Sequence, residues 1–290
     1  MNFFQKLFGG KEETKEEAKV QNDAKDFEVL KYDGVRAMKT GQYDYAIRCF
    51  KHALEIQDDL EIHDHLSITY ATTNQLNDAY EELLLLNEAQ PDNIKVLIRM
   101  ANIAYMMENY GMMGLACEKA LMIDKDNAEV NYLYAQASKG QGDDVNTVAL
   151  TTKAISLNDK YGDAYLLRGE TLLRMEKLDE ADEDALWLIE HTDNNEDVLL
   201  LKARIERARK TNEKALEYFT KVIEADPFSA VAYKERGEVY AEMGEAGKAE
   251  EDAAKAAELS PVEEAEGGNP SEDIEQKIND KYKDMNPYGF

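Results

Sequence analysis

A period of 34 residues runs through most of the chain and constrains its fold more than any other feature. Lys214–Pro227 reads KALEYFTKVIEADP, and Lys248–Pro261, 34 residues later, reads KAEEDAAKAAELSP. Proline is rare, with 5 in 290 residues, and Pro91 lies four periods before Pro227. A fixed period of this length is typical of repeat proteins, in which each unit buries its apolar face only by stacking on its neighbours.

Three columns of residues recur at this period. The first holds only small residues, which indicates that two helix backbones approach closely there; it comprises Gly34, Ser67, Ala101, Ala135, Gly169, Ala203 and Gly237. The second, mostly alanine, comprises Ala46, Ala79, Met113, Thr147, Ala181, Ala215 and Ala249. The third is wholly apolar and comprises Ala53, Leu86, Ala120, Ala154, Leu188, Val222 and Ala256.

Turn and stop signals divide each unit into two helices. Glycine-containing turns, such as those beginning at Gly41, Gly142 and Gly244, fall between the first two columns. Proline or runs of Asp, Asn and Lys follow the third column, as at Pro227 and Asp58-Asp59. We therefore expect two helices of about a dozen residues in each unit, joined by a short turn.

These columns resemble the tetratricopeptide repeat. The last unit carries the fuller pattern of that family in Tyr233, Gly237, Tyr240, Ala249, Ala256 and Pro261. The resemblance implies an all-α fold: a right-handed superhelical solenoid of about seven helix-turn-helix repeats, spanning residues 27–263. We expect residues 1–26 to form a flexible tail with a short apolar segment. Residues 264–290 are expected to hold a linker, a C-terminal capping helix and a C-terminal peptide.

The two ends carry candidate recognition segments. Residues 3–8, FFQKLF, place Phe4, Leu7 and Phe8 on one helical face. This segment is a candidate hook for a partner protein or for weak membrane contact, or has no function. Near the other end, Ile274, Ile278 and Tyr282 form one apolar stripe on a charged helix, which suits a cap on the last repeat; the helix would start after Ser271. The closing residues, NPYGF, are either a recognition motif or a segment that folds back.

Composition excludes several classes of function. The net charge of -26 opposes binding to nucleic acid and to an anionic membrane surface. The sequence has no stretch of about 18 apolar residues, so no membrane-spanning helix is expected. The N-terminus does not resemble a secretory signal. Cys49 and Cys117 fall in predicted amphipathic helices and are expected to be small buried residues. We therefore expect a cytoplasmic protein.

Candidate binding residues follow from the resemblance. In this family the first helix of each repeat lines a groove that holds an extended peptide or a helix of a partner. The resemblance therefore implies groove contacts by Lys95, Arg99, Asn102, Tyr105, Tyr132, Gln136, Lys139, Arg174, Arg204 and Arg207. Six of these are basic, against four acidic residues in the same places: Glu129, Asp163, Glu170 and Asp197. We expect a locally basic groove that binds an acidic or carboxylate-bearing peptide. The alternative is that these side chains are solvated or paired within the chain.

One specific version of this site is disfavoured. Some members of the family grip a C-terminal carboxylate with a clamp of two Lys, two Asn and one Arg. The matching positions here are Lys31, Val35, His65, Lys95 and Arg99, so both asparagines are replaced.

No catalytic, metal or cofactor site is predicted. His63 and His65 are two residues apart on a helix and therefore point to different faces. The acidic run Asp179–Asp184, DEADED, is expected to be a solvated helix face. No phosphate-binding glycine loop, nucleophile elbow or Cys–His set is present. We therefore expect a non-catalytic scaffold that binds another protein or peptide. It could instead be a chaperone-associated cofactor or a non-catalytic subunit of a larger complex, and self-association through the ends of the array is also possible.

Overall fold

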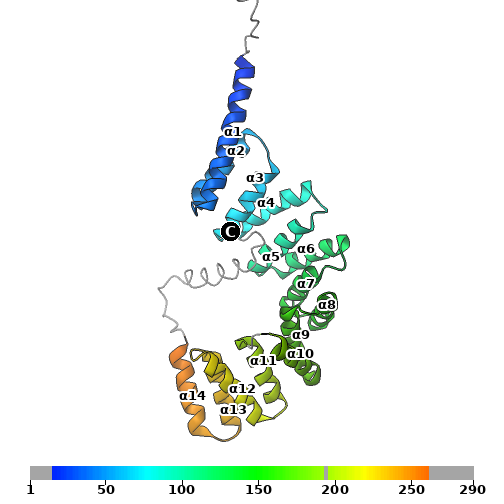
Figure 1. The fold of residues 1–290 in the computed structure, drawn as a ribbon, viewed down its shortest axis with the longest axis vertical. Coiled ribbons are helices and arrows are strands. Elements are labelled where there is room, and N and C mark those ends of the chain that lie inside the picture. Colours follow the sequence, from blue (N-terminus) through cyan, green and yellow to red (C-terminus); the bar gives the residue numbers. More distant parts are fainter. Residues whose placement is uncertain (1–14, 193–194, 261–290) are drawn as a thin grey trace, which may run out of the picture. The chain divides into compact units, whose positions relative to one another are not determined.

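The computed structural model describes residues 15–192 and 195–260, and it contains fourteen helices and no strand within them (Figure 1). The first six helices are α1 (Lys15–Lys39), α2 (Tyr43–Ile56), α3 (Leu60–Thr72), α4 (Leu76–Ala89), α5 (Ile94–Met106) and α6 (Tyr110–Ile123). The next four are α7 (Ala128–Gly140), α8 (Asp144–Leu157), α9 (Gly162–Arg174) and α10 (Leu178–His191). The last four are α11 (Glu196–Ala208), α12 (Asn212–Ala225), α13 (Ala230–Glu242) and α14 (Ala246–Leu259). The all-helical repeat fold is confirmed.

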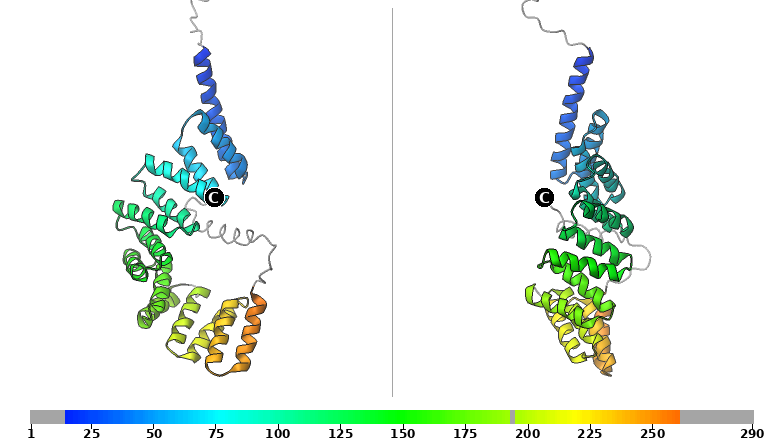
Figure 2. Two further views of the ribbon diagram at one scale, coloured as in Figure 1. Left: turned by 180° about the vertical axis from the view of Figure 1, so that it is seen from behind. Right: turned by 90° about the vertical axis from the view of Figure 1, so that its right-hand side faces the viewer.

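The chain divides into two compact units, with the division between Ile103 and Ala104. Within each unit consecutive helices pack as hairpins, such as α1 with α2 and α13 with α14 (Figures 1 and 2). In the second unit the first helices of adjacent repeats also contact one another, α7 with α9 and α9 with α11. The second helices α8, α10 and α12 do not contact one another to the same extent. The first helices of this unit therefore lie on the inside of its curve.

The ends of the array differ in part from the expected boundaries. Helix α1 begins at Lys15, within the segment 1–26 that we expected to be a flexible tail, so at least residues 15–26 are helical. The helical pattern of the first repeat simply continues backwards through charged residues that favour helix. The segment FFQKLF, the linker, the capping helix and the NPYGF peptide lie outside the described residues.

The column of small residues has the physical cause that its composition indicates. A Cβ atom on Gly34 would lie 2.5 Å from a ring carbon of Phe50, and one on Gly169 would lie 2.9 Å from Leu201. One on Gly237 would lie 3.1 Å from the Cβ of Asp252. All seven residues of this column are buried, so a larger side chain would force the helices apart.

The turn inside each repeat places one residue in the left-handed region of backbone conformation. The seven residues recur at steps of 33 or 34 and are Gly41, Asn74, Glu108, Gly142, Glu176, Lys210 and Gly244, with φ between 54° and 80°. Sequence reasoning found the three glycines. It missed Asn74, Glu108, Glu176 and Lys210, because residues with a Cβ seldom adopt this conformation.

Polar caps begin several helices. Asp59 accepts a hydrogen bond from the backbone N–H of Ile62 at 3.1 Å, and Ser229 accepts one from Ala232 at 3.1 Å. Asn127 accepts one from the N–H of Val130, also at 3.1 Å. Polar residues expected to stop one helix thus start the next one.

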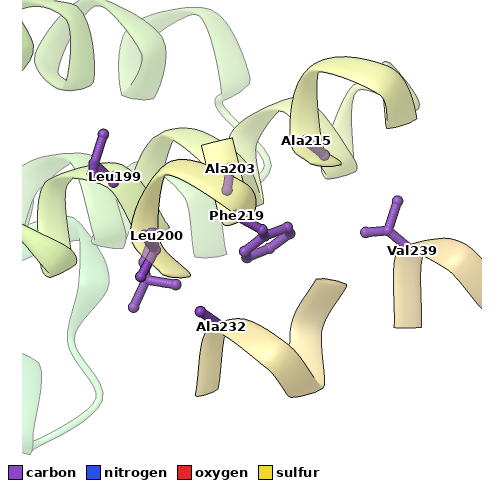
Figure 3. Packing of buried hydrophobic residues seen from close by; sticks show 8 residues of the cluster. Leu199, Leu200, Ala203, Ala215, Phe219, Ala232 and Val239 are labelled. Carbon is purple, nitrogen blue, oxygen red and sulfur yellow. The ribbon is translucent and has the colours of Figure 1, made fainter. Parts of the chain in front are cut away.

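The core between α11, α12 and α13 shows how repeats join. Phe219 of α12 is fully buried and lies among Leu200 and Ala203 of α11 and Ala232 and Val239 of α13 (Figure 3). Burying a side chain of this size contributes about 1.5–3 kcal/mol. One aromatic ring therefore packs against helices from two adjacent repeats and stabilises their contact.

Part of the acidic run in α10 is not solvated, which corrects the sequence interpretation. Asp184 is 4% exposed and accepts two hydrogen bonds from the guanidinium of Arg168, at 2.9 and 2.6 Å. Arg236 and Asp252, two repeats on, pair in the same way. Asp182 pairs with Arg209 at 2.7 Å and with the buried Lys202. These aspartates stabilise the packing of helices, because a buried carboxylate requires a charged partner.

Candidate functional site

A cleft of about 380 Å³ opens on the face formed by the first helices of the second unit. Its walls come from the end of α5, the start of α6, and from α7 and α9. It is lined by Tyr105, Tyr110, Tyr132, Gln136, Lys139, Gly140, Asp163, Leu166, Leu167, Glu170 and Arg174. Aromatic rings and a few polar groups in a concave site are what ligand-binding clefts in proteins share.

Tyrosine rings dominate this cleft. The rings of Tyr105 and Tyr110 meet edge to face, with centroids 6.3 Å apart. The ring of Tyr132 lies 4.9 Å from that of Tyr161, and the Nε2 of Gln136 donates a hydrogen bond of 3.2 Å to the Tyr132 hydroxyl. Burial and the nearby Asp163 carboxylate raise the pKa of both Tyr132 and Tyr161. Both hydroxyls therefore stay protonated and can donate hydrogen bonds.

Gly140 allows one of these rings to take its place. A Cβ atom on Gly140 would lie 2.3 Å from the ring of Tyr110. The ring thus rests directly on the backbone at the end of α7, and any other residue would push it away.

The basic residues of the cleft are paired within the chain. The Nζ of Lys139 lies 2.7 Å from a carboxylate oxygen of Glu170. The Nε of Arg174 donates to Asp144 at 3.0 Å, and a second guanidinium nitrogen bonds the other oxygen. Asp163, by contrast, has no ion-pair partner among the described residues.

The other predicted arginines are also paired. Arg204 donates to both oxygens of Glu235, at 2.8 and 2.6 Å. Arg207 pairs with Glu238 and Glu242, each at 2.7 Å. In the first unit Arg99 binds Asp64 and Ser67. Each of these contacts bridges the first helices of successive repeats, so the expected basic excess of the groove is neutralised.

The ten predicted residues fall into separate groups. Five line the tyrosine cleft: Tyr105, Tyr132, Gln136, Lys139 and Arg174. Arg204 and Arg207 line a second hollow, and Lys95 and Arg99 line one in the first unit. Asn102 lines none of these three. Sequence reasoning missed Tyr110, which lines the cleft, and Tyr161, whose ring packs behind Tyr132, because it searched only the body of each first helix. Both lie at helix starts, where tyrosine right after a turn was the available signal.

Comparison with known proteins agrees with the helical-repeat fold described above. A model of the tetratricopeptide repeat matches residues 196–229, which contain α11 and α12. This stretch therefore carries one tetratricopeptide repeat, and the other helix pairs share its helix-turn-helix architecture. Two solved structures share the fold of this array. One is PilF of Pseudomonas aeruginosa, with a TM-score of 0.57 and 17% identity, covering 74% of this chain and 97% of that one. The other is YrrB, described as a tetratricopeptide-repeat protein with an unusual peptide-binding site, with a TM-score of 0.53 and 22% identity, covering 64% and 95%.

A longer human protein also matches this chain. It is named protein O-mannosyl-transferase TMTC3 and is 27% identical over 210 residues. The match covers 68% of this chain but 20% of the human protein. The chain thus corresponds to about a fifth of that relative's length.

The other sites weighed from the sequence take no part in the cleft. Lys31, of the carboxylate-clamp pattern, pairs with Asp59 at 3.2 Å and Glu61 at 2.7 Å. His65 stacks on Phe50 with centroids 5.5 Å apart, and burial lowers its pKa. In residues 15–192 and 195–260, no group of three or more His, Cys, Asp or Glu could hold a metal ion.

Two further expectations concern the cysteines and membrane insertion. Cys49 and Cys117 are both free and buried, as expected. None of the fourteen described helices is long and apolar enough to cross a lipid bilayer.

Proposed function

We propose that this protein is a non-catalytic scaffold that holds a peptide or a helix of a partner protein on the face of its first helices. The observation that carries the proposal is the tyrosine cleft of α5, α6, α7 and α9. Tyrosine is enriched at the energetic centres of protein interfaces, because its ring buries a large area and its hydroxyl still bonds. The peptide-binding site named for YrrB, which shares the fold, supports the same reading.

Of the ten residues predicted from the sequence, the five that line the tyrosine cleft are the main proposed contacts, and the other five have at most a small part. Tyr105, Tyr132 and Gln136 would touch the partner directly, since they line the cleft. The arginines are less available, because each already binds a carboxylate of the chain. An acidic or C-terminal carboxylate-bearing partner would have to displace these carboxylates, so the ion pairs argue against that preference.

A chaperone-associated cofactor and a non-catalytic subunit of a complex are narrower versions of the same proposal, and the identity of the partner separates them. A cytoplasmic location is also a proposal. Its support is that the two buried cysteines carry free thiols, as is usual where thiols are kept reduced.

Affinity capture from native cells tests the scaffold proposal. The baits are the wild-type chain, Tyr132→Ala and the matched control Tyr134→Ala, which lies on the same helix. Tyr134 points elsewhere and bonds Glu118 at 2.5 Å. Circular dichroism first establishes that both variants stay helical. A partner lost only with Tyr132→Ala supports the proposal, and partners that bind all three baits equally would contradict it.

A further inference from the structure

Two carboxylates without a counter-charge lie at the tyrosine cleft: Asp163 lines it, and Glu129 lies at its border, where its charge acts on Tyr161, whose ring packs against Tyr132. Glu129 and Asp163 hold the same position in successive repeats, one period apart in α7 and α9. Neither has an ion-pair partner in the part of the chain that the structure describes. The cleft's two cations, Lys139 and Arg174, already bind other carboxylates. Asp163 in the lining and Glu129 at its border are therefore left without a counter-charge.

Aromatic rings lie beside this charge. The negative charges of Asp163 and Glu129 both act on the hydroxyl of Tyr161, whose ring packs against that of Tyr132. The Tyr132 hydroxyl is also acted on by Asp163 and lies near that of Tyr105. The faces of tyrosine rings attract cations within about 6 Å of the ring centroid. Carboxylates and ring faces thus both favour a cationic ligand.

We propose that the cleft binds a cationic side chain, arginine above all, presented by a peptide segment of net positive charge. This inference rests on the proposed function of the cleft and names the chemistry of the partner. It replaces the acidic peptide expected from the sequence, because the arginines that suggested it are internally neutralised.

Arginine fits this site better than lysine. Its planar guanidinium can stack on a tyrosine ring while donating two parallel hydrogen bonds to a carboxylate. The net charge of the chain, -26, attracts a cationic segment over longer distances and raises its association rate at low salt.

The next repeat provides an internal control. Asp197 in α11 stands one period after Asp163. Tyr132 and Tyr161 lie beside Asp163. The residues one period later, which hold the same positions relative to Asp197, are Leu166 and Asn195, and neither carries a ring. The charge of Asp197 also acts on Arg204, a nearby cation of the same helix. The α11 position therefore lacks the rings on which a cationic side chain would stack, and a cation already lies near its carboxylate.

The test begins with a random dodecapeptide library displayed on phage and selected on the full chain. The tightest peptides are synthesised, and their affinities are measured by calorimetry against four proteins. These are the wild type, Tyr132→Ala, the pair Glu129→Gln with Asp163→Asn, and the control Asp197→Asn. A second form of each peptide carries citrulline, which keeps the shape of arginine without its charge.

We expect the selected peptides to contain arginine. The citrulline form and the Glu129→Gln, Asp163→Asn protein should each weaken binding at least tenfold, while Asp197→Asn should change it less than twofold. Peptides that bind through Tyr132 but are acidic, or that tolerate citrulline and the charge-removing pair, would overturn this inference and leave the proposed function standing. Peptides insensitive to Tyr132→Ala, or a selection that yields no peptide, would contradict both.

Discussion

The face of α7 and α9 and the face of α11 and α13 are built from equivalent positions of one repeat, yet they present different chemistry. The first holds a tyrosine cleft, and Asp163 in its lining and Glu129 at its border lack ion-pair partners among the described residues. The second holds a hollow of about 460 Å³, in which Arg204 pairs with Glu235 and Arg207 with Glu238; its lining comprises Arg204, Arg207, Val231, Lys234, Glu235 and Glu238. In the second region the polar groups join repeats. In the first, Lys139 and Arg174 are also paired, but Asp163 and the tyrosine rings remain available to a partner.

This difference shows that the sign of a charged residue does not decide whether it binds a ligand. Arg204 donates to both oxygens of Glu235, so its donors face a partner inside the chain. Asp163 has a similar exposed position on the neighbouring first helix but meets rings rather than a cation. A ligand competes with existing pairs in one region and completes an unpaired site in the other.

The largest expected effect comes from the core beneath the paired region. Phe219→Ala removes a ring that fills the space between α11, α12 and α13, and should reduce the free energy of unfolding by about 3–5 kcal/mol. Because stability in repeat arrays is largely a matter of neighbouring units, amide hydrogen exchange should accelerate most in α11–α13. Equal acceleration of exchange in α7 and α9 would show that the two regions are not stabilised independently.

A charge reversal in the paired region should affect stability and spare binding. Arg204→Glu sets a carboxylate against Glu235 and near Glu170, and should cost about 1–2 kcal/mol of stability. Urea denaturation measures this cost. The affinity for a cleft-binding peptide should stay within twofold, and a tenfold loss would show that the paired face also binds.

A smaller effect is expected from the residue that seats Tyr110. Gly140→Ala places a methyl group 2.3 Å from its ring, and should cost about 1 kcal/mol through overpacking while weakening peptide binding several-fold. The matched control is Gly114→Ala in α6, where the nearest atom is 3.5 Å away. Gly114→Ala should leave the affinity for the peptide unchanged. If calorimetry finds the same affinity for both variants, Tyr110 does not contribute to binding.

The smallest effect concerns the turns, which are the same in both regions. Glu176→Gly and Lys210→Gly relieve a left-handed residue in the α9–α10 and α11–α12 turns, and each should stabilise the chain by about 0.5 kcal/mol. Thermal melting measures both. Stabilisation at only one of the two turns would show that the repeats differ in backbone as well as in surface.

Much of the fold follows from the sequence, because the constraints on it are local and repeat. The columns of small and apolar residues mark helix contacts that recur in every unit. At Gly34 and Gly169, for example, the side chains of Phe50 and Leu201 lie where a Cβ atom would clash with them. The left-handed turns at Glu108, Glu176 and Lys210 escaped prediction, since tertiary packing there overrides the preference of the residue.

The site was predicted only in part. The choice of first helices located Tyr105, Tyr132 and Gln136 in one cleft. Counting charges on those helices could not reveal that Arg204 faces Glu235, because the pairing depends on how successive repeats are registered in space. The basic groove stays a prediction, and the ion pairs of its arginines within the chain argue against it.

Photo-crosslinking tests the central claim most directly. A selected peptide carrying benzoylphenylalanine next to its arginine is irradiated with the full chain, and the crosslinked residues are identified by mass spectrometry. We predict crosslinks within residues 105–174, on the walls of the tyrosine cleft. Crosslinks concentrated on α11 and α13, around Arg204 and Glu235, would contradict the account.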